Sequence, residues 1–217
     1  MISTPDTPSL PETLPIFPLT GVLLLPRGRL PLNIFEPRYL AMIRDALGGE
    51  RLIGMIQPSD PSEGGMNPAL YATGCAGRIT SFSETDDGRY LITLTGVSRF
   101  RVREELPLLS GYRRVVPSWP EFAADLAPAE LGIDRERLIR GLRLFFEQRG
   151  VEADWTMIDK APGEHLVHSI AMLCPFAPNE KQALLESADL AARAELLTSL
   201  VEMAAIKPGP EGGATRH

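Results

Sequence analysis

Five prolines interrupt an apolar stretch between Leu14 and Leu40, LPIFPLTGVLLLPRGRLPLNIFEPRYL, and they restrict what it can form. A membrane-spanning helix needs about 20 apolar residues, whereas the longest uncharged run here ends before Arg27 and contains three prolines. No basic segment precedes the stretch and no small-residue cleavage site follows it, which argues against a secretory signal peptide. The stretch instead predicts short strands whose ends and bends are fixed by proline, packed into a closed or nearly closed β structure.

Charge and cysteine content narrow the classes of partner. Residues 1–116 carry 12 Lys and Arg against 12 Asp and Glu, so the net charge of −6 lies in residues 117–217. Binding to nucleic acid or to an anionic membrane needs a surplus of positive charge, which this chain lacks. Cys75 and Cys174 lie far apart in apolar surroundings and predict two buried free thiols in a reducing cytosol. We therefore expect a cytoplasmic protein with no membrane partner.

The chain changes character once between two tails. Residues 1–13 and 206–217 are polar and rich in proline or glycine, and we expect both to be disordered. Residues 14–120 give strand patterns with one helix that begins near Pro37. Residues 121–205 give helical patterns. This segregation predicts an α+β chain, in which a β-rich subdomain with one inserted helix precedes a helical subdomain.

The β-rich part contains a clear hairpin pattern. Two alternating runs flank Asp87 and Gly88, a dipeptide typical of tight turns. Along the second run, Phe100 and Val102 are predicted to face inward. The arginines that alternate with them are predicted to face outward: Arg99, Arg101 and Arg103.

Cap residues delimit the predicted helices of the second part. Asp134 is a plausible N-cap for the helix that Gly150 ends. Asn179 and Asp189 are predicted to cap the last two helices. A largely apolar helix, GEHLVHSIAMLCPF, which closes at Pro175, is expected between Gly150 and Asn179.

Motifs for catalysis are missing from the sequence. No Gly-Lys pair exists, so a phosphate-binding P-loop is absent, and no G-x-S-x-G segment presents a nucleophilic serine. Asp86 and Asp87 are adjacent carboxylates, but aspartate is favoured at turns for its backbone hydrogen bonds. We interpret this pair as turn residues.

A weak metal-site pattern occurs in EHLVHSIAMLC. His165 and His168 stand at i and i+3 on one predicted helix, and Cys174 follows. Two imidazoles at this spacing can share a metal ion, which would still need further ligands. The simpler interpretation is a core helix with both histidines at its polar edge, and we predict no metal and no cofactor.

Arginines on the last strands permit an alternative function. Such a face could bind an anionic ligand, although alternating arginines on a strand are more often solvated and paired with carboxylates such as Glu104 and Glu105. The residues of this alternative nucleic-acid or nucleotide-binding face are Arg99, Arg101, Arg103, Arg113 and Arg114.

Three segments, taken in order, resemble the N-terminal, substrate-binding domain of Lon-type ATP-dependent proteases. They are LPIFPLTGVLLLPRGRLPLNIFEPRYLAMIRDAL, GCAGRITSFSETDDGRYLITLTGVSRFRV and PNEKQALLESADLAARAELLTSLVE, and the resemblance runs from about Leu14 to Met203. It implies a PUA-like β pseudo-barrel with one inserted helix, followed by a C-terminal helical bundle. The ATPase motor and the Ser–Lys protease domain of full-length Lon have no counterpart in this sequence, so we expect a non-catalytic protein.

The resemblance implies a protein that recognises unfolded or tagged polypeptides in protein quality control. A protease or a chaperone is the further partner it suggests, and we expect a monomer or a weak dimer. The client would bind in a groove between the β part and the first helix or the loop at Pro58–Pro68, or add to a sheet edge. Core packing is the competing interpretation of Phe35 and Tyr39. The candidate peptide-binding residues are Leu32, Phe35, Glu36, Arg38, Tyr39 and Met66.

Overall fold

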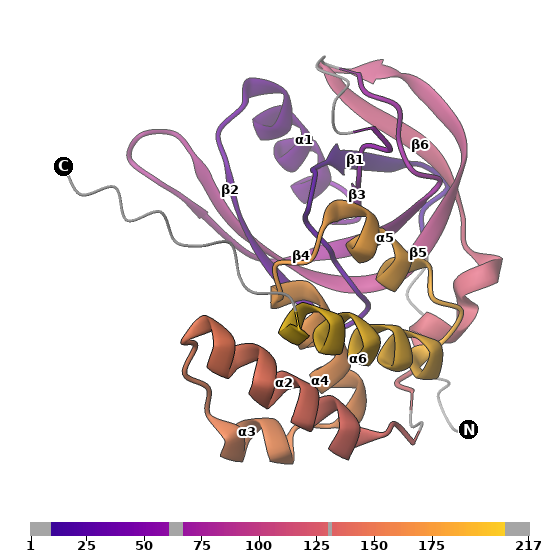
Figure 1. Ribbon diagram of the computed structural model, residues 1–217. Helices are drawn as coiled ribbons and strands as arrows, with labels where there is room; N and C mark the ends of the chain where they lie inside the picture. The colour runs from indigo at the N-terminus through magenta and orange to yellow at the C-terminus, as the bar shows by residue number, and fades with distance from the viewer. Residues whose placement is uncertain (1–9, 61–66, 130–131, 207–217) are drawn as a thin grey trace, which may run out of the picture.

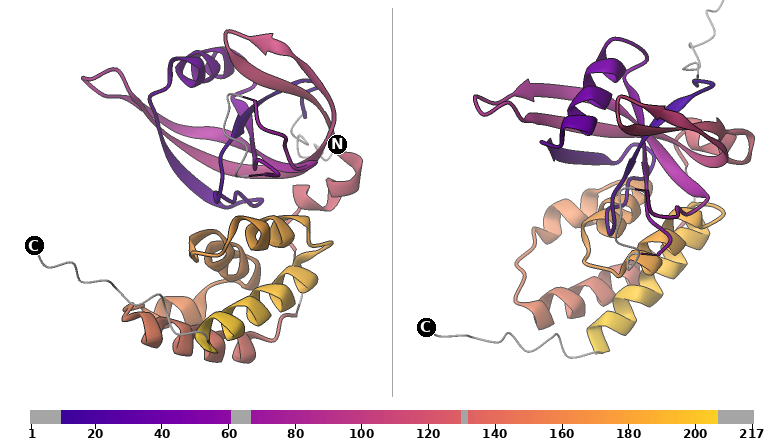
Figure 2. Two further views of the ribbon diagram at one scale, coloured as in Figure 1. Left: turned by 45° about the horizontal axis from the view of Figure 1, so that its top comes forward. Right: turned by 90° about the horizontal axis from the view of Figure 1, so that it is seen from above.

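The computed structural model describes residues 10–60, 67–129 and 132–206. The strands lie together with α1 (Pro37–Leu47) in one half of the molecule, and the later helices form the other half (Figure 1). Both views of Figure 2 show the helical half below the strands. The predicted segregation of strands and helices is thus confirmed. Met66 and most of the two predicted tails lie outside the described residues.

Six strands form one mixed sheet, in which β1 and β3 run parallel and the other pairs antiparallel. The strand order is β2-β5-β4-β3-β1-β6, and β5 also pairs with β6. Five of the strands therefore close into a ring, and among the described residues β2, outside this ring, pairs with β5 alone. The strands are β1 (Leu14–Pro18), β2 (Arg29–Ile34), β3 (Leu52–Ile56), β4 (Thr73–Glu84), β5 (Tyr90–Leu109) and β6 (Tyr112–Ser118).

The length and curvature of β5 allow the ring to close. This strand has 20 residues and pairs with β2 near its start and with β6 from Arg101 onward. Register shifts interrupt its ladders with β4 and β6, and such bulges bend and twist a strand. The hairpin predicted around Asp87 and Gly88 is confirmed, since β4 and β5 flank this turn.

The helices of the second half begin and end largely where the sequence predicts. Asp134 accepts a hydrogen bond from the Arg137 amide, and Gly150 ends the same helix in the left-handed conformation. Asp189 accepts one from the Ala192 amide. The elements are η1 (Pro120–Leu126), α2 (Arg135–Arg149), α3 (Trp155–Lys160), α4 (Gly163–Leu173), α5 (Pro178–Glu186) and α6 (Leu190–Ile206).

The predicted cap at Asn179 is wrong. Helix α5 begins two residues earlier than that cap requires, with Pro178 in its first turn and Ala177 as the N-cap residue. The Glu180 carboxylate accepts the Ala177 amide at 2.8 Å, which satisfies a donor that the helix leaves unpaired. Proline at the first helical position therefore decided where α5 starts.

One buried apolar cluster runs through both halves. It includes Leu24 and Ile34 from the β half together with Leu142 of α2 and Leu197 of α6. A smaller cluster around Phe100 fills the ring of strands. Because the larger core is continuous, the two halves form one packed unit rather than two separate modules.

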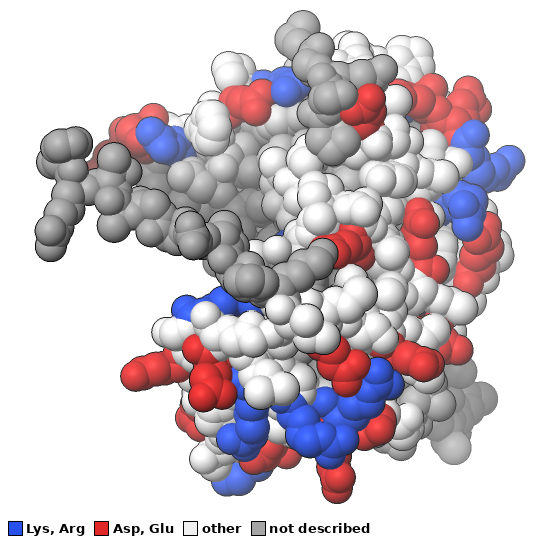
Figure 3. All heavy atoms as spheres, viewed as in Figure 1, with Lys and Arg blue, Asp and Glu red and all other residues white. Residues whose placement is uncertain are grey.

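Two sequence expectations about buried groups can be compared with this core. Cys75 and Cys174 are both buried and unpaired, as predicted. No helix of the described residues is long and apolar enough to cross a bilayer. Figure 3 shows mostly uncharged side chains in the middle of this face, acidic and basic side chains around its margin, and a group of basic side chains over the helices in its lower part.

Candidate functional site

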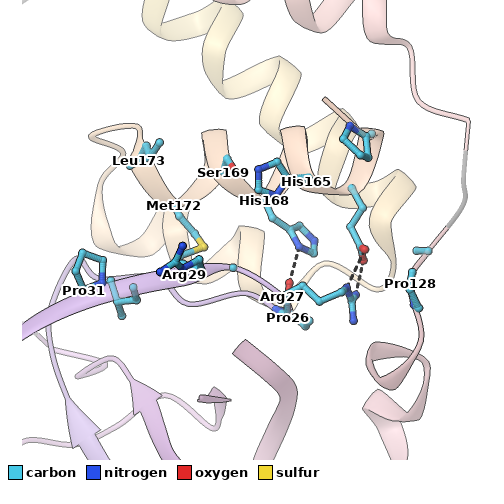
Figure 4. Close-up of a pocket in the computed structure, with 16 residues that line it drawn as sticks. Pro26, Arg27, Arg29, Pro31, Pro128, His165, His168, Ser169, Met172 and Leu173 are labelled. Carbon is cyan, nitrogen blue, oxygen red and sulfur yellow. Dashed lines mark hydrogen bonds and ion pairs between the residues drawn. The ribbon is translucent and has the colours of Figure 1, made fainter. Parts of the chain in front are cut away.

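A cleft of about 570 Å³ separates the two halves at the start of β2. One wall is the chain from Pro26 to Pro31, and the other is α4, with Pro128 and Ala129 at one end. Figure 4 shows Arg29 and Pro31 on the β2 side and Ser169, Met172 and Leu173 on the α4 side. Most of the lining is apolar, which is typical of sites that bind organic groups or polypeptide side chains.

The β2 wall is held by a close crossing of two backbone segments. The Arg27 amide donates to the Gly96 carbonyl at 2.8 Å, and the Gly96 amide donates to the Gly28 carbonyl at 2.9 Å. A Cβ atom on Gly96 would lie 2.0 Å from the Leu25 carbonyl oxygen. Only glycine therefore allows β5 to approach this loop closely enough to make both bonds.

The α4 wall follows from the amphipathic pattern of that helix. Leu166, Val167 and Ile170 point into the core, while the adjacent face of the helix lines the cleft. Leu173, the last residue of α4, lies at the cleft rim with 80% of its surface exposed. An exposed leucine beside an apolar cleft offers surface that a bound ligand can bury.

A histidine joins the two walls at the bottom of the cleft. His168 Nδ1 lies 3.0 Å from the Pro26 carbonyl oxygen, and its Nε2 lies 3.0 Å from Arg193 Nη1. Because guanidinium only donates and a carbonyl only accepts, the imidazole is neutral with its proton on Nδ1. Burial and the nearby Arg193 lower the pKa of His168 to about 4.

Charge in the cleft is partly neutralised. Arg27 Nε donates to the Glu164 carboxylate at 2.8 Å, which pairs one cation with one anion across the cleft. Arg29 is exposed and has no hydrogen-bond or ion-pair partner among the described residues. The cleft therefore combines apolar walls with one unpaired guanidinium.

Comparisons with known proteins identify the family. The substrate-binding domain of ATP-dependent protease La (LON) matches residues 13–203. The chain belongs to this family. Lon protease 2 of Myxococcus xanthus is 31% identical over 198 residues, which cover 88% of this chain and 24% of that relative. Lon protease of Anaeromyxobacter dehalogenans is 29% identical over 197 residues.

Solved structures show the same fold. The Lon N-terminal domain protein from Xanthomonas campestris gives a TM-score of 0.62 at 26% identity, covering 86% of this chain and 97% of that one. The N-terminal domain of Mycobacterium avium complex Lon protease gives 0.59 at 15% identity. The curated relatives match over their N-terminal region, and this chain spans about a quarter of their length. The matched Lon domain is the non-catalytic, substrate-binding one.

The peptide-binding residues predicted for this Lon domain fall in different environments. Phe35 has 62% of its surface exposed, so the core-packing interpretation of this residue is wrong. Leu32 is half-buried, in a shallow hollow beside the cleft. Glu36 pairs with Arg38 at 2.8 Å.

Tyr39 is not available to a client. It is only 6% exposed, and its ring packs on Phe17 with 4.2 Å between the centroids. The expectation of a partly exposed Tyr39 is therefore wrong, because the first turn of α1 points this ring at the core. Burial raises its pKa above the ordinary value for tyrosine.

The five arginines of the predicted anion-binding face do not form one exposed surface. Arg99 is only 4% exposed and binds Asp125 of η1 through two bonds of 2.9 Å, so its outward, solvated placement is wrong. Here η1 and the end of α5 cover the outer side of β5. Arg113 is also buried, pairing with Glu105, whereas Arg101 pairs at the surface with Glu121. Arg103 and Arg114 remain apart from these pairs.

The two histidines also separate. His165 is exposed, while His168 is buried and fully engaged, so the placement of both at a polar edge is wrong for His168. The described residues contain no group of three or more His, Cys, Asp and Glu side chains that could hold a metal ion. Asp87 pairs with Arg89 at 2.8 Å and accepts from the Thr85 hydroxyl, in agreement with its role as a turn residue.

Sequence reasoning missed the cleft itself. Its β2 wall was interpreted only as strand and loop, and Met172 and Leu173 only as part of an apolar helix. One signal was present: Leu173 stands outside the buried stripe of α4 and directly precedes Cys174 and Pro175, where the helix must end. An apolar side chain at that position has no core to enter.

Proposed function

We propose that this domain binds exposed apolar segments of polypeptide clients in the cleft between β2 and α4. The observation that carries the proposal is the apolar cleft of about 570 Å³ with a largely exposed Leu173 at its rim. Membership of the Lon substrate-binding family supports a binding role. Unfolded or tagged proteins are the clients we infer, because they expose apolar segments that folded proteins bury.

The location of this site differs from the groove expected near α1. Phe35, at the far end of β2, is an exposed aromatic that could extend the same surface. In this proposal the domain provides recognition, and a cytosolic protease or chaperone acts on the bound client. We also infer a relation to PUA-like pseudo-barrels, supported by the β5–β6 pairing that closes the ring.

The proposal is tested by fluorescence anisotropy of a labelled, permanently unfolded protein titrated with this chain. We expect micromolar binding that persists at high salt, since apolar contacts are not screened. Leu173→Ser is expected to weaken binding about tenfold, because it removes the apolar contact area that the leucine side chain would bury against the client.

Leu144→Ser is the matched control, since Leu144 is also an exposed leucine on a helix, α2, but does not line the cleft. It is expected to leave the affinity unchanged. Absence of binding by the folded wild-type chain, or equal effects of the two substitutions, would reject the cleft as the client site.

A further inference from the structure

The outer edge of β2 is unpaired among the described residues. This strand ends the order of the sheet and pairs only with β5, in an unbroken register from Arg29 opposite Thr95 to Ile34 opposite Tyr90. The Gly96 amide donates to the Gly28 carbonyl, which fixes the phase of the ladder. Backbone groups of alternate residues point away from β5, and these residues are Arg29, Pro31 and Asn33.

Pro31 supports this phase independently. Proline has no amide hydrogen to give to a ladder, yet the β2–β5 register passes through it without a shift. Its nitrogen must therefore face the outer edge, where no bond is lost. That edge still offers the amides of Arg29 and Asn33 and the carbonyls of all three residues.

The cleft runs along this edge rather than over one face of β2. From β2 its lining includes three successive residues, Arg29, Leu30 and Pro31, whereas a face of the strand would contribute only alternate residues. The opposite wall consists of α4 residues at helical spacing, from His165 through Ser169 to Met172. The space is thus bounded by a strand edge on one side and a helix face on the other (Figure 4).

Charge points to the chemistry of the occupant. Glu164 is paired with Arg27, so the exposed guanidinium of Arg29, which has no partner in the described part of the chain, gives the cleft local positive charge. A carboxylate placed beside Arg29 would gain a charge-assisted hydrogen bond. Met172 and Leu173 add apolar surface from the α4 side, and the Met172 sulfur lies against Gly28 next to Arg29.

We propose that the client segment binds as an added strand along the outer edge of β2. Its backbone pairs with Arg29 and Asn33, an apolar side chain packs on Met172 and Leu173, and a carboxylate side chain pairs with Arg29. This inference rests on the proposed function and adds the binding mode and the preference for acidic, apolar segments. Recognition through main-chain bonds also explains how one cleft could accept many sequences.

An amide-methylation scan tests the binding mode. The probe is a fluorescein-labelled peptide of about six residues, a typical strand length, that alternates valine and threonine around one glutamate. Each amide is methylated in turn, and affinity is measured by anisotropy. Methylation of amides that face β2 is expected to weaken binding about tenfold, and methylation of the others to change it little. If the loss of affinity did not alternate from one methylated amide to the next, the added-strand mode would be wrong.

A proline substitution tests the same edge from the protein side. Asn33→Pro removes an outward amide hydrogen while leaving the β2–β5 ladder intact, as Pro31 already does. It is expected to weaken the peptide about tenfold. Asn33→Ala keeps the amide and removes only the side chain, so it is the control and is expected to bind normally. Circular dichroism checks that both variants fold, and the methylation scan decides the matter should Asn33→Pro unfold.

A charge exchange tests the carboxylate preference. Arg29→Glu is expected to weaken the glutamate peptide about tenfold and to favour a lysine version of it. Arg103→Glu reverses an exposed arginine that does not line the cleft, and it is expected to leave the preference for glutamate unchanged. Equal affinities of both peptides for wild type would overturn the preference.

The two proposals fail in different ways. If the wild-type chain binds neither the peptide nor the unfolded protein, the proposed function itself is wrong. If both bind, with loss on Leu173→Ser but no dependence on amide methylation or on Arg29, the cleft is a client site and the added-strand mode is wrong.

Discussion

The imidazole of His168 lies between one group that favours its protonated form and one that favours its neutral form, and burial strengthens the second effect. The Pro26 carbonyl accepts its proton, and the Arg193 guanidinium donates to its other nitrogen. The side chain of Arg193 is itself buried, and its second terminal nitrogen has no hydrogen-bond partner among the described residues. A proton added to His168 would therefore place two cations in contact in a region with little water.

This arrangement predicts sensitivity to acid. In the unfolded chain His168 takes up a proton near its ordinary pKa of 6.5, whereas in the folded protein its pKa is about 4. Protonation therefore favours the unfolded state, and the free energy of unfolding should fall as pH drops from 6.5 toward 4. The loss from this residue is about 3 kcal/mol.

Urea unfolding at a series of pH values measures this slope. His168→Asn is expected to be less stable than wild type at neutral pH but to lose less stability on acidification. The matched control is His165→Asn, because His165 is exposed and should leave the wild-type slope unchanged. Equal slopes for all three proteins would contradict the assignment.

Among the elements, β5 and the loop before β2 show where sequence patterns are sufficient and where they are not. Alternation along β5 correctly places Phe100 on the buried side. The same alternation fails at Arg99, because a period of two gives the side of a strand but not what covers that side. Covering by η1 depends on a contact between residues 26 positions apart.

The cleft could not be predicted for a related reason. Its walls come from β2 and α4, which are far apart in sequence. No local sequence pattern indicates that these two elements lie next to each other in the fold. Helix caps such as Asp134 and turns such as Asp87–Gly88 were predictable because their hydrogen bonds close within a few residues. The strand and helix patterns supplied the fold class and the resemblance supplied the family, whereas the position of the cleft required the three-dimensional structure.

The crossing of β5 and the loop before β2 predicts a severe effect at Gly96. Gly96→Ala would place a methyl group 2.0 Å from the Leu25 carbonyl oxygen, so the backbone must move. We expect a loss of about 3 kcal/mol in the free energy of unfolding, measured by chemical denaturation. Gly132→Ala is the control, since nothing lies within 4 Å of its Cβ position. A stability loss of the same size in both would contradict this role of Gly96.

For the whole molecule, the contact between the halves combines apolar packing with buried polar bonds. The larger core is continuous through both halves, and Lys181 of α5 donates to the Gly21 carbonyl at 2.9 Å. Gln57, just after β3, donates to the Pro178 carbonyl and to Gln182. Such contacts favour a single cooperative unfolding transition for the whole domain.

Arg99 is the residue through which this cooperativity can be tested. Its guanidinium binds Asp125 of η1 and also donates to the carbonyls of Leu185 and Ser187, at 3.1 and 2.6 Å. One buried side chain of β5 thus connects η1 and the end of α5. Asp125→Asn would leave this guanidinium buried without its carboxylate, and we expect a loss of about 3 kcal/mol.

Glu121→Gln provides the comparison, because it removes the exposed partner of Arg101 on the same two elements. Solvent screens that pair, so we expect little change in the urea midpoint. In both variants the strands and helices should unfold in one transition. Tryptophan fluorescence and circular dichroism monitor this transition. Two separate transitions in Asp125→Asn would mean that the two halves unfold independently. The cleft would then lie between two parts that can move relative to each other.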